Sequence, residues 1–181
     1  MTTLTKTELE HKIFYHFTGA TLRNGEPIPR KGRWLKHDGQ VIPCESGLHA
    51  SPTPFDALQY APGEMLHQVQ LRGTIIPHGD PVDKFAASER KIVATIECTP
   101  ILRLFARRVA LDVIHLWDAP QIVREYLETG DESKRAAARD AAWAAAWDAA
   151  WNAAWAAKQQ RYAQWFNEMV EAEFAGRKEK K

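Results

Sequence analysis

Residues 13–18 read IFYHFT, a run of β-forming residues that is apolar on both of its alternating faces. Phe14 and His16 fall on one face, and Tyr15 and Phe17 fall on the other. A strand with two largely apolar faces is typical of the interior of a sheet, whereas a strand with one wetted face alternates apolar and polar residues. The run therefore predicts an interior strand near the start of the chain.

Two more stretches of the N-terminal half predict strands. MLHQVQLRG (65–73) alternates and places Val69 and Leu71 on one face, and KIVATIE (91–97) is rich in β-branched residues. Between the expected strands, PTPFDALQYA (52–61) has the apolar spacing and the proline start of a short helix.

From residue 101 the pattern changes to apolar residues at helical spacing, beginning with ILRLFARRVALDVIHLW. Asp118 is the predicted N-cap of a further helix, with Pro120 in its first turn and Gln121 at the capping-box position. Gly130 follows the expected end of that helix.

Residues 135–158, RAAARDAAWAAAWDAAWNAAWAAK, repeat the four-residue unit A-A-W-x. Alanine is the strongest helix former and nothing inside the run breaks a helix, so one helix is expected from about Ser133 to Phe174. At 1.5 Å per residue it would be on the order of 60 Å long, and its four indoles would sweep a stripe of roughly 120°. This indole stripe consists of Trp143, Trp147, Trp151 and Trp155.

These patterns together predict an α+β protein whose strands precede its helices. We expect a compact β-rich domain at 1–100, a helical linker or cap at 101–130, and the long Ala/Trp-repeat helix with a basic tail at 131–181.

Four indoles left in water would exceed the apolar patch usual on a monomer, so the indole stripe is expected to be covered. The rest of the chain, a second copy in a homo-oligomer, and a different protein all remain open as the cover. Base stacking would need interleaved cations, and there is no Lys or Arg between residues 140 and 157. Nucleic acid is therefore not an expected partner.

The composition and motifs also bear on nucleic-acid binding, cellular location, and the use of metals or cofactors. With 24 Lys and Arg against 23 Asp and Glu, the net charge of +1 gives no sign of nucleic-acid binding. The first residues lack an apolar signal region, and Asp148 interrupts the alanine-rich stretch. Neither secretion nor a membrane span is therefore expected, and the predicted location is cytoplasmic.

Cys44 and Cys98 lack metal-ligand spacing, so no metal is predicted. A reduced compartment is expected, and one disulfide between them stays open. Phosphate-loop, dinucleotide and zinc motifs are missing, so the motifs predict no cofactor.

Residues 44–54, CESGLHASPTP, gather small polar residues around one histidine. The stretch predicts a strand that ends in a proline-initiated helix, with Ser51 as the N-cap before Pro52. His49 here and His16 in the first strand both lie in compact β-rich surroundings. For each, a buried structural histidine and a site histidine remain open, because spacing alone assembles neither a nucleophilic nor a metal site.

Residues 13–100 resemble a family of uncharacterised domains found in bacteriophage and prophage proteins. The resemblance is carried by FYHFTG (14–19), IPCESGLHASPTPFDALQYAP (42–62), LHQVQLRGTIIPHGD (66–80) and DKFAASERKI (83–92). It implies a phage or prophage origin and no particular activity.

The succession of FYHFT, GLHAS and PTPFDALQYA is also similar to ADP-ribosyltransferases. Their core runs from a strand like YHGT through a G-[ILF]-[YH]-x-[ST] strand to a helix of the form P-x-x-A-x-x-Y-A. This similarity implies NAD as cofactor, with His16 holding the nicotinamide ribose and with Thr18 and Tyr60 as further contacts. The implied catalytic residues are His16, His49, Ser51 and Glu89, with Glu97 as the alternative acid that would stabilise an oxocarbenium-like transition state.

Two functions are therefore expected. The first is a phage-type accessory protein that binds another protein, such as a host defence protein that it inhibits or redirects, through the Trp/Ala helix. The alternative is an NAD-dependent ADP-ribosyltransferase-like enzyme with a pocket at His16 and His49.

Overall fold

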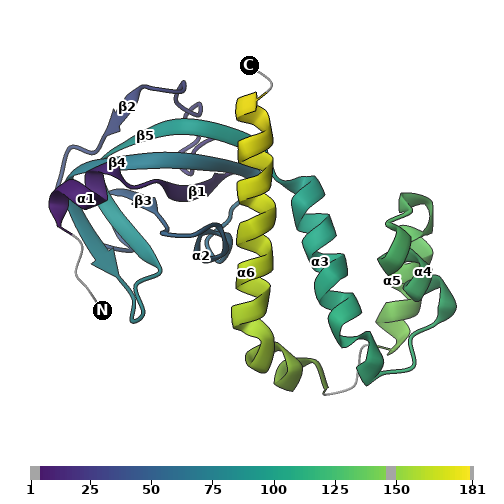
Figure 1. Ribbon diagram of the computed structural model, residues 1–181. Helices are drawn as coiled ribbons and strands as arrows, with labels where there is room; N and C mark the ends of the chain where they lie inside the picture. Colours follow the sequence, from purple (N-terminus) through teal and green to yellow (C-terminus); the bar gives the residue numbers. More distant parts are fainter. Residues whose placement is uncertain (1–4, 146–149, 180–181) are drawn as a thin grey trace. The chain divides into compact units, whose positions relative to one another are not determined.

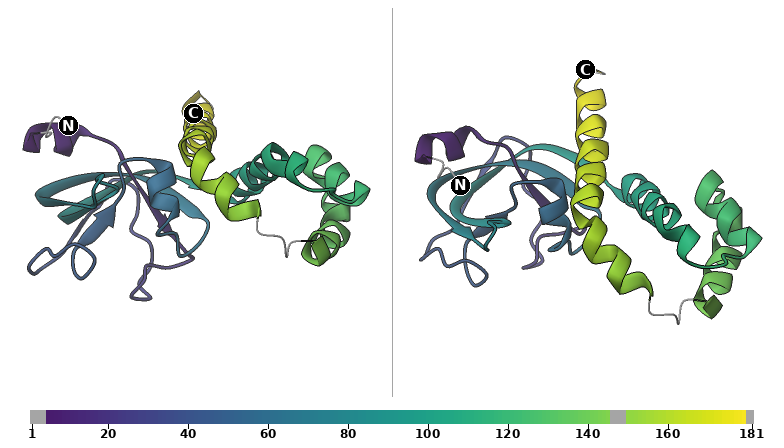
Figure 2. Two further views of the ribbon diagram at one scale, coloured as in Figure 1. Left: turned by 90° about the horizontal axis from the view of Figure 1, so that it is seen from below. Right: turned by 60° about the horizontal axis from the view of Figure 1, so that its bottom comes forward.

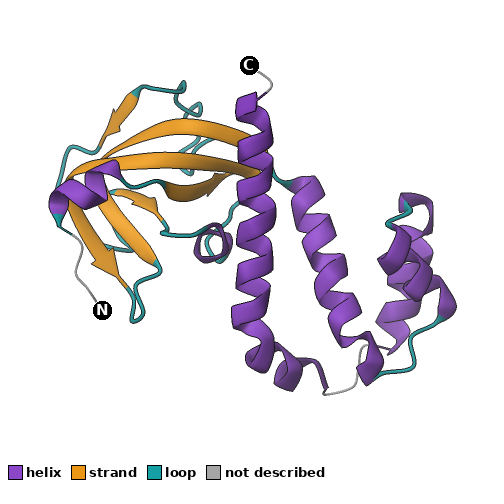
Figure 3. Cartoon of the chain, viewed as in Figure 1, coloured by secondary structure: helices purple, strands orange, loops and turns teal. Residues whose placement is uncertain are grey.

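The computed structural model describes residues 5–145 and 150–179 of the chain, without the side chains of residues 6, 143–145, 150–159 and 178–179. The chain divides into two compact units (Figure 1). The sheet unit comprises the described residues up to Cys98 together with those from Asn167 onward, and the helical unit comprises Thr99–Phe166. The sheet precedes most of the helices, which confirms the predicted α+β class (Figure 3). Compactness thus groups the end of the chain with the sheet, whereas the sequence patterns divide the chain into consecutive segments.

The strands form one antiparallel sheet in the order β1-β4-β5-β2, with β3 also paired to β5. Their bounds are β1 (Phe14–Thr18), β2 (Trp34–Lys36), β3 (Leu48–Ala50), β4 (Met65–His78) and β5 (Lys84–Glu97). All three predicted strand runs are therefore confirmed. Just after β3, Ser51 and Tyr15 exchange both backbone hydrogen bonds, at 2.9 and 2.8 Å. β1 thus stands at the end of the strand order, and this isolated bridge bonds its other edge at Tyr15, so the predicted interior position holds at that residue.

The long hairpin of β4 and β5 is interrupted by two register shifts, one of them between Arg72 and Ile75. Gly73 lies inside this shift with φ of +79°, and a Cβ there would come within 2.3 Å of the Ser88 hydroxyl oxygen. Glycine is required here because other residues rarely adopt this backbone conformation and because the space is taken.

The sheet unit has a continuous apolar core. The rings of Phe14 and Phe85 meet edge to face with centroids 5.1 Å apart. Burying each side chain of this size contributes about 1.5–3 kcal/mol. The core residues are Phe14, Ala50, Val69, Leu71, Phe85, Ala87 and Ile92.

The helices are α1 (Lys6–His11), α2 (Pro54–Leu58), α3 (Thr99–Val113), α4 (Gln121–Thr129), α5 (Arg135–Ala145) and α6 (Ala150–Glu179), with 3₁₀ turns at Ile114–Leu116 and Glu132–Lys134. The predicted N-cap for α2, Ser51, is wrong. Both backbone groups of Ser51 pair with Tyr15, and the side chain of Thr53 instead accepts the N–H of Asp56 at 3.1 Å. The helix therefore starts at Pro54, one proline later than expected.

The last part of α6 belongs to the sheet unit. The hydroxyl of Tyr15 donates to the Glu171 carboxylate, and the side-chain oxygen of Asn167 accepts the N–H of Phe55 at 2.8 Å. Val170 and Phe174 are buried on the same helix.

In the helical unit, α3 and residues 160–166 of α6 lie side by side in each view (Figures 1 and 2). The rings of Phe105 and Phe166 are 5.0 Å apart, and the Tyr162 hydroxyl donates to Asp112 at 2.8 Å. Aromatic contacts of this kind add about 0.5–1.5 kcal/mol to the burial itself.

The predicted N-cap of α4, Asp118, is wrong, whereas the predicted end at Gly130 is confirmed. The backbone of Pro120 is extended, with ψ of 147°, and its carbonyl accepts the N–H of Val123 at 2.9 Å, so the helix begins beyond the reach of Asp118. Gly130 has φ of +70° and donates to the carbonyl oxygen of Tyr126 at 2.8 Å, which closes the last turn.

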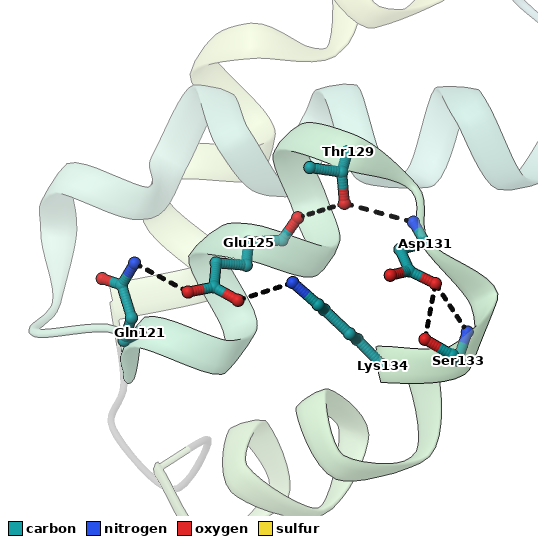
Figure 4. A network of polar contacts seen from close by, with 6 residues as sticks. All are labelled: Gln121, Glu125, Thr129, Asp131, Ser133 and Lys134. Carbon is teal, nitrogen blue, oxygen red and sulfur yellow. Dashed lines mark hydrogen bonds and ion pairs between the residues drawn. The ribbon is translucent and has the colours of Figure 1, made fainter.

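A polar network ties the end of α4 to the turn that follows (Figure 4). Lys134 Nζ lies 2.7 Å from Glu125 Oε2, and both side chains are about one-third exposed. Pairs of this kind contribute roughly 0–1 kcal/mol, so the network fixes the path of the chain more than it stabilises the unit. Its members are Gln121, Glu125, Thr129, Asp131, Ser133 and Lys134.

The Ala/Trp repeat spans α5, α6 and residues 146–149, which lie outside the described residues. The same holds for the predicted continuity of one helix through this segment and for the four side chains of the indole stripe. Among the helices of the described part of the chain, none has the length and apolar character needed to cross a bilayer.

Candidate functional site

A cavity of about 650 Å³ lies in the sheet unit, along β1, β3 and the ends of the loops beside them. Small-molecule sites commonly fall between about 300 and 1,000 Å³. Five residues that the sequence places in a site line this cavity: His16, Thr18, His49, Ser51 and Tyr60. The structure therefore brings together side chains from three separate parts of the sequence.

The structure brings neither predicted acid to this cavity. Arg72 donates from Nε and Nη2 to Glu89 Oε2, at 2.8 and 2.6 Å. Glu97 lies at the far end of β5, opposite Met65. Successive residues of a strand point to opposite faces, so only one of Glu89 and Arg90 can face the cavity, and that one is Arg90.

Arg90 and Lys84 are the two buried cations of the cavity, and sequence reasoning missed both. Arg90 is 7% exposed and Lys84 is 8% exposed. Arg90 Nη1 donates to the carbonyl oxygen of His49, and burial lowers the pKa of Arg90 to about 10. Among the residues that the structure describes, no carboxylate pairs with either cation. Alternation would have placed these two cations on one face, because they are six positions apart, if the strand had been predicted to begin at Lys84 instead of Lys91.

Lys84 contacts two other residues that line the cavity, Cys44 and Tyr60. Its Nζ lies 3.1 Å from Cys44 Sγ and 4.0 Å from the centroid of the Tyr60 ring. The Tyr60 hydroxyl donates to Asp83 at 2.7 Å, and this hydrogen bond raises the pKa of Tyr60 to about 12. Tyr60 therefore stays protonated and presents its ring face to the ammonium group.

His49 and Cys44 form the rim of the same region. The backbone N–H of Cys44 donates to His49 Nε2 at 3.1 Å, which places the proton of the neutral ring on Nδ1. Burial, and after it the charge of Lys84, lowers the pKa of His49. Cys44 has φ of +69°, an uncommon conformation for a residue with a side chain.

His16 lies across the β1–β4 pair from His67. Burial, followed by the charge of Arg90, holds the pKa of His16 well below its usual range. His67 is 1% exposed, its ring nitrogens lie 2.9 Å from the Thr18 hydroxyl and 2.8 Å from the Thr95 hydroxyl, and burial lowers its pKa to about 4. Both rings are therefore neutral at neutral pH.

The charges that line the cavity favour an anion. Its cationic residues are Arg23, Lys36, Lys84 and Arg90, and its acidic residues are Glu26 and Glu45. Both acids are exposed to solvent, whereas two of the cations are buried. Buried cations suit an anionic group, and neutral imidazoles can donate to or accept from hydroxyl groups. They do not supply the acid that transfer of ADP-ribose would require.

Residues 13–104, just over half of the chain, match the family described as a domain of unknown function, DUF7666. The chain belongs to that family. The DUF7666 domain contains β1 to β5 and every residue that lines the cavity. No curated protein and no solved structure matches the chain.

Proposed function

We propose that the DUF7666 domain binds a small anionic ligand that carries phosphate groups, in the cavity between His16 and His49. The observation that supports this function is the burial of Lys84 and Arg90 in one cavity without a carboxylate partner among the described residues. Buried charges in proteins are ordinarily paired, because removing an ion from water costs several kcal/mol. An anionic ligand would supply the missing charge.

Each side chain has a role in this proposal. Arg90 offers a planar set of N–H donors that suits phosphate oxygens, and Lys84 adds a point charge. His16 and His49 are neutral and suit the hydroxyl groups of a sugar better than a second phosphate. A nucleoside diphosphate fits this combination.

NAD is the nucleotide that the similarity to ADP-ribosyltransferases suggests. In that case Arg90 and Lys84 would hold the pyrophosphate, and His16 would hold a ribose. Because Glu89 is bound to Arg72 and does not line the cavity, the proposal is ligand binding, without transfer of ADP-ribose.

Calorimetric titration with ADP-ribose, NAD and uncharged adenosine tests the proposal. We expect saturable binding of the two pyrophosphates and weak binding of adenosine. Arg90→Met and Lys84→Met should each reduce affinity by about tenfold or more, because each loses charged hydrogen bonds. Lys31→Met is the matched control, since Lys31 is exposed and lies outside the lining of the cavity. Unchanged affinity in Arg90→Met, or no binding at millimolar ligand, would refute the proposal.

A second candidate function is favoured by the Ala/Trp repeat of the sequence. We propose that the indole stripe contacts a protein, as a second copy or as a host defence protein that a phage-type accessory protein binds in the bacterial cytoplasm. Aromatic side chains are the usual centres of such interfaces. The double substitution Trp147→Ala with Trp151→Ala keeps a strong helix former at both positions and should weaken association. Unchanged size-exclusion and pull-down behaviour would exclude this contact.

A further inference from the structure

The two thiols of the chain lie in opposite surroundings. Cys98 is fully buried, and burial raises its pKa to about 12, so it is a poor nucleophile. Cys44 is exposed at the rim of the cavity. Only the second of these thiols is accessible to a reagent.

Polar groups surround the Cys44 sulfur. Lys84 Nζ lies 3.1 Å from Sγ and His78 Nε2 lies 3.3 Å from it. The hydrogen bond from the Cys44 N–H to His49 fixes the backbone in its left-handed conformation. When the sulfur reacts as a thiolate, an ammonium group is already in contact with the developing charge. Among the described residues, no group of three metal-ligating side chains comes together.

A separate observation indicates the charge of the reactant. Arg90 lines the same cavity, is 7% exposed and has no carboxylate partner in the described part of the chain. A molecule that reaches Cys44 from the cavity therefore meets two buried cations. An anion is attracted, and a cation is repelled.

We propose that Cys44 is a modification site that forms a mixed disulfide with an anionic low-molecular-weight disulfide. The Cys44 thiolate attacks one sulfur of that disulfide, the existing S–S bond breaks, and a new bond forms from Sγ. The second half of the reagent leaves as a thiolate and the proton that Cys44 has lost balances its charge, so the low-molecular-weight disulfide is itself the oxidant and no other is needed. The charge preference rests on the anion-binding function proposed above.

The adduct has a consequence for that function. Lys84 contacts both Cys44 and the ring of Tyr60, so an anionic group on Cys44 would occupy the ammonium group that a phosphate ligand needs. Modification of Cys44 should therefore exclude the ligand, and reduction by an added thiol should restore binding. The site would make ligand binding sensitive to the thiol–disulfide balance.

Reaction rates with two disulfides test the proposal on the full chain: dianionic 5,5′-dithiobis(2-nitrobenzoate) and neutral 2,2′-dithiodipyridine, each compared with the rate for a free cysteine peptide. For each reagent, the rate constant on Cys44 is divided by the rate constant on the peptide. This ratio should be about tenfold higher for the anionic reagent than for the neutral one. Mass spectrometry should locate the adduct on Cys44, and Cys44→Ser should abolish it while Cys98→Ser retains it. Lys84→Met should remove the charge preference, and Lys31→Met should retain it.

Labelling of Cys98 in place of Cys44, or equal relative rates for both reagents, would overturn the inference. Titration with ADP-ribose on the same preparation separates the two proposals. Intact ADP-ribose binding with an unreactive Cys44 refutes the modification site alone. A Cys44 that shows the charge preference supports the modification site even where ADP-ribose does not bind, and that result refutes only the nucleotide ligand.

Discussion

The interiors of the two units differ in what they bury. Among the side chains that the structure describes, the buried polar and charged ones are those of Thr18, Ser51, His67, Gln68, Lys84 and Arg90, and all belong to the sheet unit. In Thr99–Phe166 the buried residues of the described part are apolar, except that Tyr162 carries a hydroxyl bonded to Asp112. An interior that serves only stability avoids groups that are costly to remove from water. In the sheet unit, four of these six residues line the cavity, namely Thr18, Ser51, Lys84 and Arg90, which is why we propose a function there.

The largest effect is expected in the mainly apolar interior of the helical unit. Phe166 is fully buried against Phe105, so Phe166→Ala should lower the free energy of unfolding by about 3–5 kcal/mol, through lost burial and the cavity left behind. Urea unfolding followed by circular dichroism measures this loss. Leu104→Ala on the neighbouring helix is the control, because Leu104 is 48% exposed and its loss should change stability by no more than about 0.5 kcal/mol. Equal effects of the two substitutions would contradict the assignment of Phe166 to a packed core.

The next effect comes from a polar group in the sheet unit. The pKa of His67 is about 4 in the folded chain, against an ordinary 6.5. Between these values the unfolded chain binds the extra proton, so the free energy of unfolding falls as the pH falls through this window. The full shift corresponds to on the order of 3 kcal/mol, present above about pH 6.5 and lost by about pH 4. Urea unfolding at several pH values measures the slope.

His67→Gln is the matched variant for this pH dependence. Glutamine keeps a polar group between the hydroxyls of Thr18 and Thr95 and does not titrate. The variant should therefore lose much of the slope between about pH 6.5 and 4, and His16 should account for part of what remains. An unchanged slope would mean that His67 does not set the acid sensitivity of the sheet unit.

The sequence predicted the strands better than it predicted the caps. The period of apolar residues in IFYHFT and KIVATIE depends on local sequence alone, and both runs are strands. The cap at Ser51 was wrong because tertiary pairing decided it, and the cap at Asp118 was wrong because the extended backbone of Pro120 delays the start of the helix. Ser51 is taken by β1, and α4 begins only after Pro120. The pairing of a serine with a strand that is distant in sequence depends on the tertiary structure, so local sequence does not predict it.

The candidate site was predicted only in part, because its histidines have local sequence signals and its buried cations do not. His16 and His49 were predicted from their compact β-rich surroundings and from the similarity to ADP-ribosyltransferases, and both line one cavity. Lys84 and Arg90 were missed because a cation in a strand ordinarily occupies the wetted face, and their burial depends on β3 pairing with β5. The choice of Glu89 as the acid overlooked strand alternation, since its neighbour Arg90 takes the face that lines the cavity.

The smallest expected change in the free energy of unfolding concerns Arg90, the buried guanidinium of the cavity. Arg90→Met replaces a buried guanidinium by an apolar side chain of similar length and loses one hydrogen bond to the carbonyl oxygen of His49. Because the charge lacks a carboxylate partner in the described residues, we expect the ligand-free variant to be more stable than the wild type by about 1 kcal/mol in urea unfolding. Arg72→Met is the control, since Arg72 is paired with Glu89 and its guanidinium lies 4.0 Å from the centroid of the Trp34 ring, so its loss should destabilise the chain.

Saturating ADP-ribose should make the wild type more stable than Arg90→Met, since a ligand at about 100 times its Kd stabilises the wild type by roughly 2.7 kcal/mol. If Arg90→Met instead destabilises the ligand-free chain as much as Arg72→Met does, Arg90 is a structural residue and the difference between the two interiors carries no functional meaning.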